Sequence, residues 1–165
     1  MRKIGFHGGC RICELGPVSD VALFFECLKT NAEYDCPAQD WSLLTDRLYR
    51  RYLRLEELAA ASALMGQVRL IFAGLPASAV EWDPSMVGNA EKTWLDPSLP
   101  TLADVFRKYF EHFADVRSSA ESFLKDFNIY QPVRVVISDL PGFARDKNKP
   151  LAEYDALEGK PFWLQ

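Results

Sequence analysis

The stretch Cys10-Arg11-Ile12-Cys13 holds the two residues whose type and spacing come closest to a known chemical motif. In a CxxC redox pair, the first thiol has a lowered pKa and attacks as the thiolate. A thioredoxin-like pair opens a helix directly, whereas here Gly16 and Pro17 intervene before any helical pattern. Because buried free cysteine commonly behaves as a small hydrophobic residue, we interpret Cys10 and Cys13 as thiols that pack or line a turn.

The same stretch also contains metal-ligating residue types. His7, Cys10 and Cys13, completed by Cys27 or Cys36, would supply the four tetrahedral ligands of a zinc site. The second CxxC or HxxxH half that normally accompanies such a site is absent from the sequence. We therefore predict no metal and no cofactor. A small thiol- or zinc-dependent enzyme centred on His7, Cys10 and Cys13 is the alternative.

Other catalytic patterns have little support in the sequence. The only histidines are His7 and His112, so a Ser-His-Asp or Cys-His mechanism has few possible bases. His112 is most simply a surface or partly packed residue of a helix. The pair Gly8-Gly9 lacks the spacing of a Walker loop or a dinucleotide fingerprint. We predict a protein that has no catalytic residue and is not an enzyme.

Length and composition predict one soluble domain over residues 1–165. Hydrophobic residues make up 48% of the chain, which is enough for a core of its own. The net charge of −4 argues against nucleic acid or an anionic membrane as the direct partner. The apolar tract at 70–80 is far shorter than the roughly 20 residues that cross a bilayer, and the N-terminus lacks the apolar run of a signal peptide. We expect a cytoplasmic protein with reduced cysteines.

The fold class that these patterns predict is α+β, or mixed α/β. Short stretches at residues 3–7, 78–82 and 132–138 are expected to form a small central sheet, because they are rich in β-branched and aromatic residues or end in glycines. Amphipathic helices are expected to cover this sheet. The long segment 83–100 contains several prolines and few periodic apolar positions, so we expect an ordered loop or an exposed recognition surface there.

The helical pattern is clearest after Pro100. Four aromatic rings recur at helical spacing from Phe106 to Phe113, and Thr101 is placed to cap the first turn. Ser118 and Glu121 have capping-box spacing and suggest a second helix that ends near Asn128. Further helices are expected from Ser19 or Asp20 to about Thr30, from Asp40 through Tyr52, and from Leu55 to Ala73 with Gly74 as C-cap. The apolar tail at 161–164 is expected to dock on the body.

Several segments in this order resemble the immunity 70 family of bacterial polymorphic-toxin systems. They are an N-terminal strand with glycines, a helix containing Phe24-Phe25, a helix containing Leu48-Tyr49, the segment 79–83, a loop containing Trp94, and a helix at 102–110. The resemblance implies an antidote of a contact-dependent inhibition or secretion system. Such a protein binds its cognate toxin C-terminal domain, commonly a nuclease, in the cytoplasm of the producing cell. The resemblance implies no catalytic residue.

An immunity protein of this kind would neutralise a nuclease by covering a site built to hold phosphates with an acidic surface. Charge would steer association, while exposed aromatic residues would supply much of the affinity. Two separate surfaces are candidates for binding the toxin, the loop 81–94 and the tail 139–158. The candidate toxin-binding residues are Glu81, Trp82, Asp83, Trp94, Asp139, Glu153, Tyr154 and Asp155. A non-enzymatic adaptor without a toxin partner is a further alternative.

Overall fold

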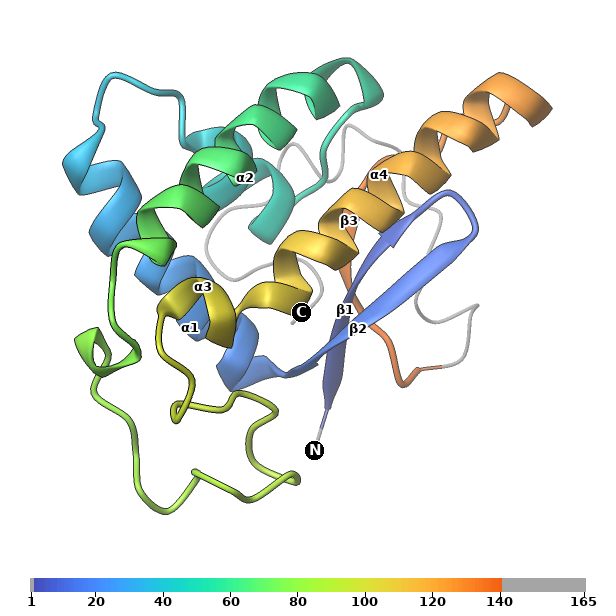
Figure 1. Ribbon diagram of the computed structural model, residues 1–165. Helices are drawn as coiled ribbons and strands as arrows, with labels where there is room; N and C mark the ends of the chain where they lie inside the picture. The colour runs from blue at the N-terminus through green and yellow to red at the C-terminus, as the bar shows by residue number, and fades with distance from the viewer. Residues whose placement is uncertain (1, 141–165) are drawn as a thin grey trace.

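A three-stranded antiparallel sheet in the order β2-β1-β3 lies along one side of the molecule (Figure 1). The computed structural model describes residues 2–140. Its strands are β1 (Lys3–Gly8), β2 (Arg11–Pro17) and β3 (Arg134–Ile137), and several helices pack against them. The predicted α+β class with a small sheet is therefore confirmed, as are the first and last of the expected strands. The expected docking of the tail at 161–164 falls outside the described residues.

The first two strands form a hairpin that the sequence patterns did not predict. Gly9, in the turn, has a φ of +58°, a conformation that glycine adopts at little cost. A Cβ atom at Gly8 would lie 2.4 Å from the Val116 carbonyl oxygen, and one at Gly9 would lie 2.5 Å from that of Ser119. Both contacts are with α4 (Arg107–Phe127), so the two glycines let the hairpin approach the helix backbone directly.

The helix after Pro100 begins at the position predicted from the sequence. Thr101 caps α3 (Leu102–Val105), because its hydroxyl accepts a hydrogen bond from the Asp104 backbone N–H at 3.2 Å. The Asp104 carboxylate in turn accepts one from the Thr101 N–H, which completes a capping box. The predicted second start at Ser118 is wrong, since α4 runs through it without a break. Asn128, with a φ of 53°, ends α4 as expected.

The remaining helices depart from the sequence expectations mainly at their starts. The helix α1 (Val18–Leu28) has Pro17 before it, so neither Ser19 nor Asp20 is its cap. Two π-helical turns, η1 (Lys29–Glu33) and η2 (Leu43–Leu48), replace the end of that helix and the regular helix expected from residue 40. The 3₁₀ turn η3 (Leu55–Glu57) leads into α2 (Leu58–Ala73), which ends at Gly74 as predicted. None of these helices is both long and apolar enough to cross a bilayer, and the same holds for the rest of residues 2–140.

The predicted strand at 78–82 is wrong. The segment opens with the 3₁₀ turn η4 (Ala77–Ala79) and then continues without regular structure. The Trp82 indole N–H donates to the Ala77 carbonyl oxygen at 2.8 Å, which folds the segment back on itself. The β-branched Val80 and the aromatic Trp82 therefore suggested a strand where a side-chain hydrogen bond stabilises a turn.

The core is built around aromatic rings from four elements. Phe24 of α1 packs against Phe72 of α2 and against Phe106, Tyr109 and Phe110, with ring centroids between 4.7 and 5.9 Å apart. The ring of Phe6 on β1 packs edge-on against Tyr109 and Phe113, at 6.5 and 5.9 Å. The helix α4 therefore lies between the sheet and the other helices, as Figure 1 shows.

Tyr109 brings an unpaired hydroxyl into this core. Its side chain is 1% exposed, and its hydroxyl oxygen has no hydrogen-bond partner among residues 2–140. Burial, and to a lesser extent the charge of Asp20, raises the pKa of Tyr109 well above its usual value. Burying such a group without a partner costs about 1–3 kcal/mol.

Replacing Tyr109 with phenylalanine is therefore expected to raise the free energy of unfolding by about 1 kcal/mol, as measured by urea denaturation. Tyr52→Phe is the matched control, because Tyr52 is equally buried but its hydroxyl accepts a hydrogen bond from Arg54 Nη2 at 3.3 Å. Tyr52→Phe is expected to lower the free energy of unfolding by about 1 kcal/mol. A destabilised Tyr109→Phe variant would show that the hydroxyl has a partner that stabilises the fold.

Candidate functional site

The loop between η4 and α3, residues 80–100, is the longest segment of residues 2–140 without a regular helix or strand. Short side-chain hydrogen bonds shape it internally. The backbone N–H groups of Ser85 and Ser98 donate to the carboxylates of Asp83 and Asp96 at 2.8 and 3.0 Å. Bonds from these serines lower the pKa of both carboxyl groups. The loop is thus a series of local turns.

Asp20 of α1 fastens this loop to the core. One carboxylate oxygen accepts a hydrogen bond from the Thr93 hydroxyl at 2.7 Å, and the other accepts one from the Trp94 backbone N–H at 2.8 Å. The residue is 2% exposed. Burial raises the pKa of Asp20, although the two hydrogen bonds oppose that shift. The sequence analysis assigned Asp20 to a helix cap, and no local pattern indicates a bond to residues more than 70 positions away.

The two candidate tryptophans of the loop have different environments. Trp82 is half-buried and packs against the core, so only part of its ring is accessible. Trp94 is 36% exposed, its indole N–H donates to the Ala90 carbonyl oxygen, and the Lys3 ammonium lies 5.6 Å from its ring centroid. Trp94 is therefore the better placed of the two to contact a partner.

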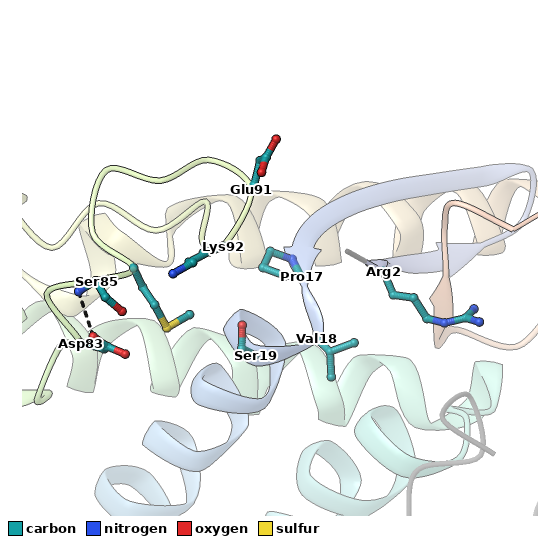
Figure 2. Close-up of a pocket in the computed structure, with 9 residues that line it drawn as sticks. Arg2, Pro17, Val18, Ser19, Asp83, Ser85, Glu91 and Lys92 are labelled. Carbon is teal, nitrogen blue, oxygen red and sulfur yellow. Dashed lines mark hydrogen bonds between the residues drawn. The ribbon is translucent and has the colours of Figure 1, made fainter.

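The charged candidates Glu81 and Asp83 are both exposed. Asp83 lines a cleft of about 600 Å³ between the loop and the start of α1 (Figure 2). Figure 2 shows Val18 and Ser19 on one side of this cleft and the loop residues on the other. Its lining residues are Arg2, Pro17, Val18, Ser19, Asp83, Ser85, Met86, Glu91 and Lys92. The cleft therefore carries both signs of charge.

Asp139 lies at the same end of the molecule as this loop. It is exposed and follows Ser138, whose N–H donates to the Lys3 carbonyl oxygen at 2.8 Å. Because the side chain of Lys3 lies over the Trp94 ring, Lys3 connects the end of β3 to the loop. Glu153, Tyr154 and Asp155 lie outside the described residues.

The structure does not gather His7, Cys10 and Cys13 into one ligand set. His7 is buried, and its Nδ1 accepts a hydrogen bond from Arg134 Nε at 3.4 Å. Cys10 is exposed in the hairpin turn, where its Sγ lies 3.7 Å from the Ser119 hydroxyl. None of the four cysteines, all of which lie within residues 2–140, is paired in a disulfide.

Cys13 lies instead beside His112 and Asp115 of α4. One ligand atom from each of the three side chains lies within 4.8 Å of the other two. This group is the one set of three metal-ligating residues found in the part of the chain that the structure describes. Cys13 faces α4 because it pairs with Phe6, whose ring packs on that helix. The i,i+3 spacing of His112 and Asp115 was the signal available in the sequence.

Comparisons with known protein families, curated proteins and solved structures give no match to this chain.

Proposed function

We propose that this protein is an immunity protein. It binds a cognate bacterial toxin domain, a nuclease, and blocks it by forming a stoichiometric complex. It acts without turnover, in the cytoplasm of the cell that produces the toxin. The observation that carries this proposal is the loop 81–94, most of whose residues are exposed although Asp20 fastens it to the core. The segment resemblance to immunity proteins adds support.

A fastened loop is suited to tight binding. Ordering a flexible loop at an interface costs free energy that is subtracted from the affinity. Here the turns at Asp83 and Asp96 and the two bonds to Asp20 order the loop as the protein folds. Long irregular loops held on a rigid scaffold commonly carry binding function. The loop therefore offers a pre-organised surface with Trp94 as its aromatic anchor.

Electrostatics favours a basic partner site. Glu81, Asp83 and Asp139 are exposed at this end of the molecule, and the whole chain carries a net charge of −4. A nuclease site that holds phosphates is electropositive, so these carboxylates would steer its approach. Arg2 and Lys92 at the cleft partly offset the acidic charge there. We therefore expect charge to govern the association rate more than the final affinity.

Charge changes in the loop test this surface. The double variant Glu81→Lys with Asp83→Asn is expected to slow association with the toxin domain roughly tenfold at low salt and to weaken its salt dependence. Asparagine at position 83 removes the charge but keeps an oxygen that accepts the Ser85 N–H bond. Stopped-flow or surface-based kinetics would measure the rate. Asp126→Lys, at the exposed far end of α4, is the control and should leave the rate within twofold.

Coexpression tests the function itself. The toxin domain encoded beside this gene should arrest growth when expressed alone, and the protein should restore growth and co-purify with it at one-to-one stoichiometry. An unrescued culture with no complex would refute the immunity function. A rescued culture with unchanged kinetics in the loop variants would instead refute the loop as the binding surface.

A further inference from the structure

We propose that Cys13, His112 and Asp115 form a binding site for a divalent transition-metal ion of the zinc class. Their side chains offer a sulfur, a nitrogen and an oxygen ligand, the donor set that Zn²⁺ takes in proteins. The site is distinct from the toxin-binding loop and does not depend on the immunity function.

The geometry requires only side-chain adjustment. The three ligand atoms lie within 4.8 Å of one another, and His112 Nδ1 is 3.7 Å from Asp115 Oδ2. Tetrahedral zinc, with a sulfur at about 2.3 Å and nitrogen or oxygen at about 2.0–2.2 Å, holds its ligands about 3.4–3.6 Å apart. The cluster therefore has to contract by about 1 Å, a movement within the reach of three side-chain torsions.

His112 supplies an independent observation. Its Nδ1 atom is buried, and no hydrogen-bond partner reaches it within residues 2–140. The Asp115 oxygen at 3.7 Å is too far away for a hydrogen bond. A buried polar atom without a protein partner needs an explanation, and a bound water or ion is one. A metal ion between the two side chains would bond both atoms.

Arg11 lies on the other side of the Asp115 carboxylate. Its Nη1 lies 3.7 Å from Asp115 Oδ1, while Asp115 Oδ2 faces His112. The arginine therefore contacts one oxygen and leaves the other for the metal.

Metal binding would require the Cys13 thiol to lose its proton. Burial and the neighbouring Asp115 raise the pKa of the Cys13 thiol, with Arg11 opposing them, so the thiol keeps its proton in the metal-free protein. A bound divalent ion would stabilise the thiolate, and the thiol proton would leave to solvent. Since the protein supplies three ligands and the side chains of His112 and Asp115 are 28% and 48% exposed, a water completes the coordination.

The test is titration of the reduced, metal-free full-length protein with Co²⁺ and Zn²⁺. One equivalent of Co²⁺ should produce a sulfur-to-metal charge-transfer band and tetrahedral ligand-field bands, and one equivalent of Zn²⁺ should remove them. Zinc should also raise the melting temperature, since it binds the folded protein. Cys13→Ser should abolish the charge-transfer band. His112→Gln and Asp115→Asn should each weaken binding by at least tenfold.

Cys10→Ser is the matched control, because it removes the other thiol of the hairpin three positions away. It should bind the metal as the unaltered protein does. Absence of a charge-transfer band in the unaltered protein, or a band that survives Cys13→Ser, would overturn the proposed site. Loss of the band in Cys10→Ser would overturn this ligand set in favour of the CxxC pair. Circular dichroism of each metal-free variant would confirm that the fold is kept.

Discussion

Replacing Phe106 with alanine is expected to lower the free energy of unfolding by about 4 kcal/mol, as measured by urea denaturation. Phe106 is fully buried between α3 and α4. Its ring centroid lies 5.3 Å from those of Phe24 and Tyr109 and 5.8 Å from that of Phe72. Removing the ring loses its transfer free energy and leaves a cavity between three helices that cannot all move inward.

Phe127→Ala is the matched control for this prediction. Phe127 lies on the same helix as the buried rings but is 65% exposed, and it contacts the Phe123 ring at 5.4 Å. Removing the Phe127 ring is expected to lower the free energy of unfolding by less than about 1 kcal/mol. Equal effects for Phe106 and Phe127 would show that the aromatic cluster is not the main source of stability.

Asp20→Ala is expected to lower the free energy of unfolding by about 3 kcal/mol. It is also expected to increase the mobility of the loop 81–94. The change removes two hydrogen bonds to a carboxylate and leaves the Trp94 N–H without its acceptor. Urea denaturation measures the stability, and hydrogen exchange at the Trp94 amide reports the loop. Unchanged stability together with unchanged exchange would refute the role of Asp20 in fastening the loop.

The pH dependence of this effect follows from the raised pKa of Asp20. The folded protein holds the Asp20 proton more tightly than the unfolded chain does, so the contribution to stability is complete below the usual carboxyl pKa of 3.8. It falls as the pH rises through the folded-state pKa. Asp20→Asn keeps one acceptor and does not titrate, so the stability difference between the unaltered protein and this variant should shrink over that window.

The sequence by itself determined the features whose chemistry is local. The Thr101 hydroxyl bonds a backbone N–H three residues away, and Asn128 ends a helix by its own left-handed conformation. The strand at 134–137 is β-branched at three of its four positions, and the ring spacing in α4 matches one helical turn. Such patterns involve residues within about four positions of one another, so they can be read without the rest of the chain.

Only the tertiary structure decided where the candidate sites lie. Strand β2 has no regular apolar alternation, and it forms because it pairs with β1 and packs on α4. That packing, which two glycines permit, carries Cys13 to His112 and Asp115, residues about 100 positions away. In the same way, the tertiary structure places Asp20 where it accepts hydrogen bonds from Thr93 and Trp94. A buried carboxylate or thiol takes the partner that folding places beside it, and that partner is set by strand pairing and helix packing instead of spacing along the chain.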